Sequence, residues 1–441
     1  MTDTSGPIET QARIGAMDVL RGVAVCGILL MNIPFMGMSW EDALPPRPPH
    51  WNADWIAFTI QNVGFAGSMR GLFTLLFGAG MMVMLRGGTD NDPTGARSQA
   101  FFTRCFALLL LGVANFALFM WPGEILFNYG LAGLVLYQFR RAQPRVLLTA
   151  AAAFLMTMSI AIGAQTAQKA DTLRQGEIAM ALDAAHKPLT DEQKAAVEAR
   201  KTLLAHAHPT REFLAAETAQ RTSFPGVLAW STARWTEFNL GPMAPIFLAE
   251  SVGFMLIGVA LFRLGVLNGS RPLSFYAGLA GIGYALGLSL RGYIQWRGWQ
   301  AGFEPNAGLM SWRDFLYEAG RLPTTLGLLG LVVALYKLGA LRGLDIGLKA
   351  IGRLALTNYI GQSVITSILF YALGFYGKFG FAQLMGICVL VWIFQGLFSV
   401  IWLARWEMGP AEWLLRSLTY GRWQALGRAP ARVTAAVAPA E

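Results

Sequence analysis

Charged side chains are scarce in this sequence. Asp, Glu, Lys and Arg make up 14% of its 441 residues, against about 25% in a typical soluble domain. Hydrophobic residues make up 54%, the mean hydropathy is +0.44, and the apolar residues form long uninterrupted blocks. In a bilayer only helices and closed barrels satisfy the polar groups of the backbone. The composition therefore predicts a polytopic helical membrane protein and excludes a soluble enzyme or a nucleic-acid-binding protein.

Cysteine and histidine are also rare, which limits the available chemistry. Cys26, Cys105 and Cys388 each lie in an apolar run, so we expect no disulfide framework, CxxC pair or haem-attachment motif. His206 and His208 are two residues apart without an evident third ligand, and we predict no metal site. P-loop, HExxH, G-x-S-x-G and strand-linked GxGxxG motifs are absent. No familiar catalytic signature assigns a function.

About ten segments are long and apolar enough to cross a bilayer, which takes roughly 20 residues. They are residues 14–35, 65–85, 102–120, 125–139, 146–164, 243–264, 273–290, 315–338, 354–375 and 381–404. The fourth is short, and the eighth contains Pro323. The first has no A-x-A exit and is expected to be retained rather than cleaved. The predicted fold is an all-α bundle of about ten transmembrane helices with a polar, partly helical extracytoplasmic loop.

The distribution of Lys and Arg predicts the orientation. The net charge is +9, and the basic loops follow the second, fourth, sixth, eighth and tenth segments. Because cytoplasmic loops are enriched in Lys and Arg, both termini are expected in the cytoplasm of a bacterium, with the chain in its inner membrane. All four histidines then fall on the outer side.

Residues 165–242 form the single strongly polar stretch. We expect four parts: a five-span half (1–164), the extracytoplasmic loop (165–242), a second five-span half (243–404) and a cytoplasmic amphipathic tail (405–441). The loop would be a lid over an outer cavity or a solvated appendage. Tryptophans and arginines alternate in the tail, which suits anchoring on membrane lipids or contact with a second subunit in a homo-oligomer.

Charged and amide residues inside spans are costly and mark polar pairs, cavities or pathways. Asp18, Arg21 and Asn32 share one face of the first span, because they are three and eleven residues apart. Asn358 and Gln362 are four apart in the ninth span, within a broad polar face. These residues would line a path through the membrane, or they would join neighbouring helices by hydrogen bonds.

Three further charged residues lie inside predicted spans. Glu318 and Arg321 are three residues apart near the outer end of the eighth span, whereas Glu250 in the sixth has no obvious local partner.

His50 differs from the other histidines, because it lies in the short, stiff sequence Pro48-Pro49-His50-Trp51-Asn52 between the first two spans. Histidine is the side chain best suited to general-base or acyl-carrier chemistry near neutral pH. Arg70 and Glu124 are near it in the predicted topology.

The sequence resembles the bacterial YeiB-like membrane proteins that share domain of unknown function 418. The matching stretches are Asp18-Val-Leu-Arg21-Gly22 with 27–32, Met69-Arg70-Gly71 with 72–80, Glu124-Ile125-Leu126 with Tyr129, Gly352-Arg353-Leu354 with 355–363, and Gly409-Pro410-Ala411-Glu412 with 413–420. They run from one end of the chain to the other.

More distantly, the first span is similar to that of transmembrane acyltransferases such as heparan-alpha-glucosaminide N-acetyltransferase and the acyltransferase-3 proteins. Their LD-x-x-RG pattern falls on Asp18, Arg21 and Gly22. Asn32 stands where acyltransferase-3 proteins have a histidine, so that catalytic pattern is absent. His50 with Trp51 and Asn52 is instead similar to the luminal histidine of the acetyltransferase.

This resemblance implies a cytoplasmic acyl-CoA donor, such as acetyl-CoA, with the acceptor at the other face. The phosphates of CoA would dock on Arg21 and Arg353, and its arm would pass between the first and ninth spans. The predicted donor-binding residues are Asp18, Arg21, Asn32, Arg353 and Gln362.

The predicted chemistry centres on His50, which would carry the acyl group or remove the acceptor's proton. Glu124 would orient His50, and Arg70 or Asn358 would stabilise the oxyanion. The acceptor would be a small molecule or a lipid-linked group. The alternatives are a transporter or lipid-binding protein that uses the same polar faces, and an assembly partner that docks through its outer loop.

Overall fold

The computed structural model describes residues 15–43, 50–85, 95–207, 209–303 and 316–427. The first helices are α1 (Gly15–Gly37), α2 (Trp40–Ala43), α3 (Ala53–Gly64), α4 (Ser68–Leu85), α5 (Ala96–Phe119), α6 (Leu126–Leu136) and η2 (Tyr137–Phe139). Next come α7 (Pro144–Ala184), α8 (Asp191–Ala207), α9 (Arg211–Gln220) and α10 (Phe224–Asn239). The last are α11 (Ala244–Arg263), α12 (Leu273–Gln300), α14 (Tyr317–Lys337), α15 (Leu344–Arg353), α16 (Ala355–Ser367), η3 (Ile368–Ala372), α17 (Phe381–Arg405) and α18 (Pro410–Tyr420).

Eight helical segments in the described ranges are long and apolar enough to cross a bilayer. This confirms the predicted all-α polytopic fold. The other two predicted spans, 125–139 and 354–375, correspond to α6 with η2 and to α16 with η3. By themselves α6 and α16 have 11 and 13 residues, fewer than the roughly 20 of a full crossing, and η3 extends α16 by 5 residues. The second span is longer than predicted, because α3 precedes α4 in one segment, Ala53–Leu85. Pro323 lies inside α14 without ending it.

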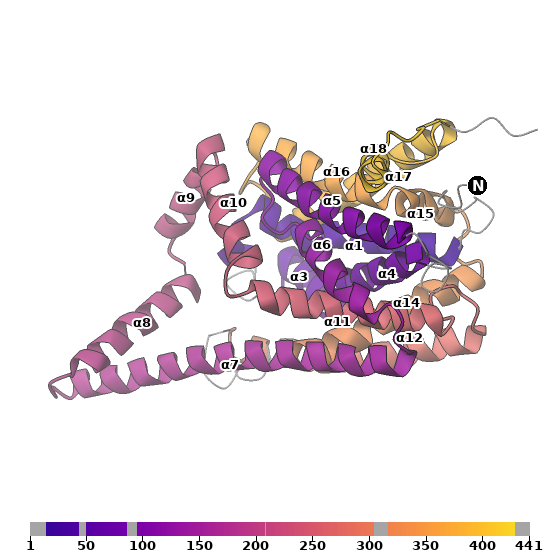
Figure 1. The fold of residues 1–441 in the computed structure, drawn as a ribbon. Coiled ribbons are helices and arrows are strands. Elements are labelled where there is room, and N and C mark those ends of the chain that lie inside the picture. Colours follow the sequence, from indigo (N-terminus) through magenta and orange to yellow (C-terminus); the bar gives the residue numbers. More distant parts are fainter. Residues whose placement is uncertain (1–14, 44–49, 86–94, 208, 304–315, 428–441) are drawn as a thin grey trace, which may run out of the picture.

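Burial separates central from peripheral helices. In α1, the α3–α4 segment, α11 and α14, 61% to 72% of the most apolar stretch is buried, against 17% to 28% in α7, α12 and α17. Apolar side chains such as Ile282 on α12 and Leu390 on α17 are exposed, as expected of helices that face lipid. Figure 1 shows α1, α4 and α6 inside the bundle and α7 along its edge.

Two glycines bring central helices α4 and α11 into backbone contact. A Cβ on Gly258 would lie 1.9 Å from the carbonyl oxygen of Leu75, and one on Gly78 would lie 2.4 Å from that of Met255. Neither distance is compatible with a side chain, so both positions require glycine. Small residues at such contacts let membrane helices pack closely.

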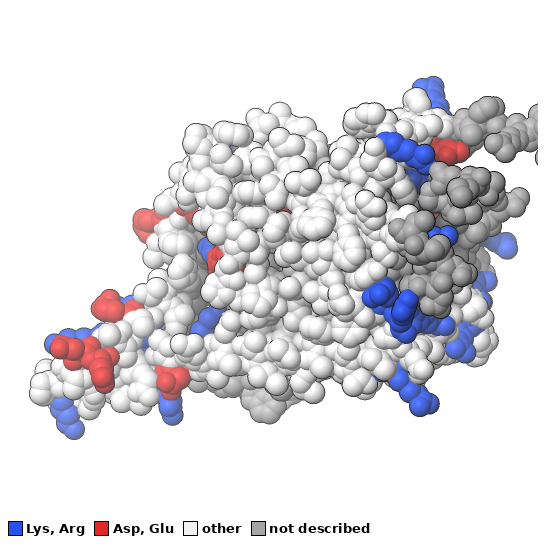
Figure 2. Space-filling model, in the orientation of Figure 1, with Lys and Arg blue, Asp and Glu red and all other residues white. Residues whose placement is uncertain are grey.

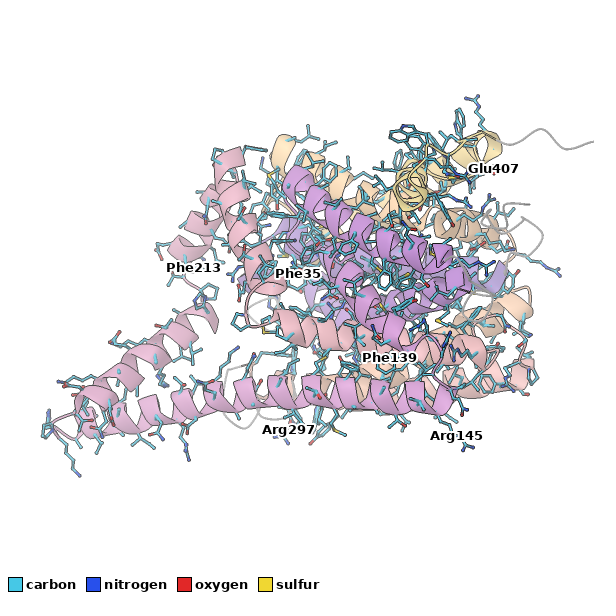
Figure 3. The ribbon with its side chains drawn as sticks, in the orientation of Figure 1. Phe35, Phe139, Arg145, Phe213, Arg297 and Glu407 are labelled. Carbon is cyan, nitrogen blue, oxygen red and sulfur yellow. The ribbon has the colours of Figure 1, made fainter. Side chains whose placement is uncertain are left out.

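The two ends of the bundle are chemically different. We name them the α10 end, where α8, α9 and α10 lie, and the α15 end, where α15 and α18 lie (Figure 1). Arg145 and Glu407 mark the α15 end, and Phe213 marks the opposite side (Figure 3). Figure 2 shows mainly Lys and Arg at the α15 end, both charge signs at the tip of α7 and α8, and an uncharged surface between them.

Helix α7 crosses the predicted boundary at residue 165. Its 41 residues make a rod of about 60 Å, twice the roughly 30 Å hydrocarbon core. Helix α8 runs back from its tip towards the bundle, and α9 and α10 follow at the α10 end (Figure 1). The polar stretch 165–242 is therefore mostly helical and continuous with the preceding span.

Replacing Gly258 by Ala should lower the thermal stability of the protein in detergent, because the new methyl group meets the Leu75 carbonyl. Overpacking of this kind costs about 1–3 kcal/mol. Gly278→Ala in α12 is the matched control, since nothing lies within 4 Å of its Cβ position. Unfolding followed by intrinsic fluorescence measures both variants, and equal melting temperatures would contradict the proposed close contact.

Candidate functional site

An ionic network joins three central helices. Glu250 on α11 accepts hydrogen bonds from Arg70 on α4 and from Arg321 on α14, with 2.5 Å between Arg321 Nη1 and Glu250 Oε1. Arg321 Nη1 also lies 2.9 Å from Oε1 of Glu318, one turn away on α14. Glu250, which has no local partner in the sequence, therefore finds two distant ones.

Most of this network is buried. The side chains of Arg321, Glu250 and Glu318 are 0%, 3% and 8% exposed, and the Arg321 guanidinium lies 4.4 Å from the centre of the Phe254 ring. Two arginines and two glutamates balance in charge, which makes their burial tolerable, because an unpaired charge in such surroundings is very costly.

Arg70 differs because its side chain remains 35% exposed. Phe73, Phe77 and Gly80 follow it on the same face of α4 and are also partly exposed, although α4 packs against α1, α11 and α14. We call these four residues the α4 stripe. It is about 15 Å long, and at its far end the Cβ position of Gly80 lies 3.8 Å from Nη2 of Arg21.

Aromatic rings line the stripe. The Phe73 ring lies 6.0 Å from that of Tyr129 and 6.4 Å from that of Tyr359, and the Phe77 ring lies 4.9 Å from that of Tyr129. The Tyr129 hydroxyl is 2.5 Å from Oγ1 of Thr74. Both ends of the stripe are thus cationic and its middle is apolar and aromatic.

Glu124 lies beside this lining, in the loop between α5 and α6. Its Oε2 accepts hydrogen bonds from the backbone N–H groups of Leu126 and Phe127 at 2.8 and 3.3 Å, and Oε1 accepts from the indole of Trp235 at 3.3 Å. The next residue, Ile125, donates its N–H to the Tyr359 hydroxyl at 2.9 Å. Burial raises the pKa of Glu124 to about 7, against the effect of these hydrogen bonds.

Asp18 and Arg21 form the ion pair that their spacing allows, with 3.0 Å between Oδ1 and Nη1. The Arg21 side chain keeps 30% exposure, and Arg104 lies within electrostatic reach of Arg21, Glu412 and Tyr420. Two arginines, each with an acidic neighbour, therefore stand at the α15 end of the stripe.

The predicted amides of α16 contact other helices. Asn358 Nδ2 donates to Oγ of Ser399 at 2.9 Å and to the Ile351 carbonyl at 3.3 Å. Gln362 Nε2 donates to the Val25 carbonyl at 3.0 Å and to Oε1 of Gln395 at 3.2 Å. Their donors are used between helices, and they lie near the α15 end, away from His50.

His50 lies in the segment that leads into α3. Its imidazole is exposed and its Nε2 is 3.0 Å from Nδ2 of Asn52, while Trp51 stacks on Trp299 near the end of α12. The hydrogen bonds of Glu124 go elsewhere, so the structure does not bring Glu124 and His50 together.

Two other residues that were predicted to bind the donor lie apart from the contacts of the α4 stripe. Asn32 on α1 is partly exposed and makes no hydrogen bond with a described residue. Arg353 Nη2 donates to the Glu407 carbonyl at 3.4 Å.

The tail makes a helix-capping contact that residue spacing alone did not reveal. Oε1 of Glu412 on α18 accepts from the N–H groups of Leu356 and Thr357 at 2.6 and 3.1 Å, capping α16. Oγ1 of Thr357 in turn accepts from the Ala411 N–H at 3.1 Å, capping α18. The signal was the Gly409-Pro410-Ala411-Glu412 stretch, a typical helix start.

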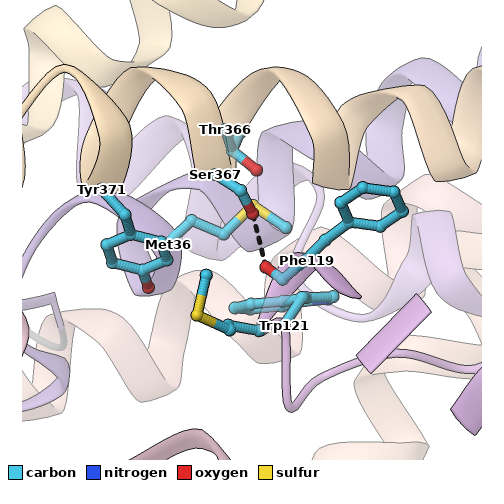
Figure 4. Close-up of a pocket in the computed structure, with 7 residues that line it drawn as sticks. Met36, Phe119, Trp121, Thr366, Ser367 and Tyr371 are labelled. Atoms are coloured by element: carbon cyan, nitrogen blue, oxygen red, sulfur yellow. Dashed lines mark hydrogen bonds between the residues drawn. The ribbon is translucent and has the colours of Figure 1, made fainter. Parts of the chain in front are cut away.

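A small pocket lies between η3 and the α5–α6 loop, lined by Met36, Phe119, Trp121, Ser367 and Tyr371 among others (Figure 4). It has no room for a ligand. Among the described residues, no group of three or more His, Cys, Asp or Glu side chains is placed to hold a metal ion.

Replacing Glu250 by Gln should strongly destabilise the protein, because it leaves Arg321 buried with a single glutamate and Arg70 without its carboxylate partner. Removing one member of a buried ionic network costs about 3–5 kcal/mol. Glu237→Gln is the control, since its ion pair with Arg234 is exposed and contributes at most about 1 kcal/mol. Denaturation in detergent compares the two, and similar losses would argue against the network's structural role.

Comparisons with known proteins identify the family of the chain. The family model described as a protein of unknown function (DUF418) matches residues 261–422. Uncharacterized protein YeiB of Escherichia coli K12 is 30% identical, over 91% of this chain and 95% of that protein. Uncharacterized protein YxaH of Bacillus subtilis 168 is 28% identical, over 96% and 98%. No solved structure matches. The chain belongs to the YeiB-like DUF418 family.

Proposed function

We propose that the chain is an integral-membrane acyltransferase, in which an acyl-CoA enters from the α15 end and its acyl group reaches Arg70. The α4 stripe carries the proposal. It is a partly exposed line within the centre of the bundle that joins Arg21 and Arg104 to Arg70, with aromatic rings between them. This arrangement matches a donor that has phosphates at one end, an uncharged arm and a reactive carbonyl at the other.

The α15 end would be the donor side and would face the cytoplasm. Lys and Arg gather there (Figure 2), and the positive-inside rule places such an end in the cytoplasm. In this proposal both termini would lie in the cytoplasm, with the chain in the inner membrane of a bacterium. Arg21 and Arg104 would bind the phosphates, since guanidinium groups make paired hydrogen bonds to phosphate oxygens, while Asp18 fixes the position of Arg21. Arg353 lies at the same end and would add positive charge.

The transfer step needs a group that stabilises the oxyanion and a general base. In the proposed step an acceptor hydroxyl or amine attacks the thioester carbon, and the new C–O or C–N bond replaces the C–S bond. The Arg70 guanidinium would stabilise the negative charge on the carbonyl oxygen. Glu124 would take the acceptor's proton, and CoA would leave as a thiolate that receives this proton from Glu124 and becomes the thiol.

Glu124 takes this role in preference to His50. Its contacts connect it to the stripe through Ile125, Tyr359 and Phe73, and its pKa is close to neutral pH, where a general base is most effective. His50 is exposed beside Asn52 at the α10 end, which suits first contact with an acceptor arriving from that side.

Transport is the second candidate, favoured by one observation. The Ala53–Leu85 segment is interrupted between α3 and α4, where Gly67 has a φ of 71°, and transporters bind substrates at such breaks. A transporter would move a solute into proteoliposomes without CoA, whereas the acyltransferase would consume acetyl-CoA and release free CoA thiol.

A larger side chain in the α4 stripe should test whether the acyl group passes along it. Phe77→Trp enlarges a side chain midway along the stripe, so CoA should still bind while acyl transfer falls at least about 10-fold, the effect of roughly 1.4 kcal/mol on the barrier. Titration calorimetry with CoA in detergent measures binding. Release of CoA thiol from acetyl-CoA, in membranes that supply the native acceptors, measures transfer.

Two variants complete that experiment. Phe106→Trp on α5 alters an exposed phenylalanine and should change neither quantity. Arg21→Gln should weaken CoA binding about 10-fold or more, the loss expected for a hydrogen bond between charged groups. Unchanged CoA affinity in Arg21→Gln together with unchanged transfer in Phe77→Trp would rule out this donor path.

Acyl transfer should increase with pH through about 7 and then level off, because the Glu124 carboxyl must lose its proton to act as the base. Glu124→Gln should remove this pH dependence and lower the rate about 10²–10⁴-fold. Glu237→Gln, at an exposed site, should retain the wild-type profile. A rising limb that persists in Glu124→Gln would assign the proton transfer to another group.

A further inference from the structure

The break between α3 and α4 is held by two arginines from other spans. Arg291 Nη2 on α12 donates to the carbonyls of Asn62 and Ala66 at 2.7 and 2.6 Å. Arg321 Nε on α14 donates to the Gly67 carbonyl at 2.9 Å. The arginines satisfy the Asn62 and Ala66 carbonyls beside the interruption, as membrane burial requires. The Gly67 carbonyl also accepts a helical hydrogen bond from the Gly71 N–H at 2.8 Å.

Several buried polar atoms around the break nevertheless lack a partner. They are the donors Arg291 Nη1, Gln295 Nε2 and Arg321 Nη2 and the acceptor Glu318 Oε2. Arg321, Glu318 and Gln295 are each more than nine-tenths buried. An unsatisfied buried polar group costs about 1–3 kcal/mol, and native proteins contain few of them, so four in one region indicate a bound polar group.

The four residues border the same region. Arg291 and Gln295 are one turn apart on α12, and Asn62 contacts both, donating to Oε1 of Gln295 at 2.7 Å. Arg291 and Arg321 bind the consecutive carbonyls of residues 66 and 67, and Arg291 is coupled electrostatically to Arg321 and Glu318. We call Arg291, Gln295, Glu318 and Arg321 the break site.

The charge around the break site favours an anion. Including the partners in the ionic network, three arginines, Arg70, Arg291 and Arg321, face two glutamates, Glu250 and Glu318. The net charge is therefore +1. Two guanidinium groups and an amide are typical donors to a phosphate group.

The position of the break site along α12 fits a lipid head group. Tyr293 and Trp296 on this helix are each 53% exposed, and Trp299 stacks on Trp51. Tyr and Trp gather at the depth of the head groups. Arg291 and Gln295 lie within one turn of these aromatic residues, so the phosphate of a lipid at the α10 end is at the right depth.

We propose that the break site binds phosphatidylglycerol. Arg291, Gln295 and Arg321 donate to the phosphodiester, which carries the single negative charge that the site lacks. A glycerol hydroxyl donates to Glu318 Oε2, the acceptor that a phosphate alone leaves unpaired. Phosphatidylcholine has the same phosphodiester but no head-group donor and no net charge, so it fits poorly. This inference does not depend on the proposed acyl transfer.

Native mass spectrometry of the delipidated full chain tests the proposal. Phosphatidylglycerol and phosphatidylcholine with identical acyl chains compete at equal concentration, and phosphatidylglycerol should be retained at least about 10-fold more strongly, corresponding to one charged hydrogen bond. Gln295→Glu conserves the size and the Asn62 contact but repels a phosphate, so it should abolish this preference. Arg297→Gln, an exposed arginine on the same helix, should retain it.

Two further measurements separate other outcomes. Glycerol 3-phosphate, added alone, should neither bind nor raise the melting temperature, and tight binding of it would show a site for soluble phosphate esters instead. Equal retention of both lipids, or a phosphatidylglycerol preference that survives in Gln295→Glu, would overturn the proposal and leave buried water as the occupant. Thermal unfolding of each variant confirms that it is folded.

Discussion

The centre of this protein depends on the hydrogen bonds that the Glu250 carboxylate accepts. It accepts from Arg70 and Arg321 at once and so fixes α4, α11 and α14 relative to one another. With α4 held this way, Arg70 and the aromatic residues of the α4 stripe share one partly exposed face. The same Arg321 reaches the break between α3 and α4. One carboxylate thus connects the proposed chemical site, the helix break and the break site.

The parts of this arrangement that are local in sequence were predictable. Apolar segment lengths predict the helices, and a three-residue spacing predicts the Asp18–Arg21 and Glu318–Arg321 pairs, which the structure contains. The partners of Glu250 lie 180 residues before it on α4 and on α14, and no periodicity specifies such a pairing. The α3–α4 break was missed because the predicted second span began at residue 65 and so left out α3. Topology predicts that His50 and Glu124 are on the same side, but a shared side leaves their separation undetermined.

The polar residues of the ninth predicted span show how one pattern serves two purposes. A polar helix face lines a cavity or joins helices, and the donors of Asn358 and Gln362 go to α1, α17 and the end of α15. The α4 stripe, with one arginine, two phenylalanines and a glycine, is instead partly exposed. The exposed fraction of the side chains distinguishes a face that lines a cavity from one that joins helices. This fraction depends on all neighbouring helices together, so the sequence of one helix does not reveal it.

The mutual capping of α16 and α18 has a consequence for how the chain is made. Glu412 is 56 residues beyond the Leu356 N–H that it accepts from, so during synthesis the start of α16 is complete only after the tenth predicted span has left the ribosome. Until then its first N–H groups must find water or another acceptor. Residues 355–420, from α16 to α18, are therefore expected to complete their assembly late, and a chain truncated before residue 410 would lose order in α16 as well as the tail itself.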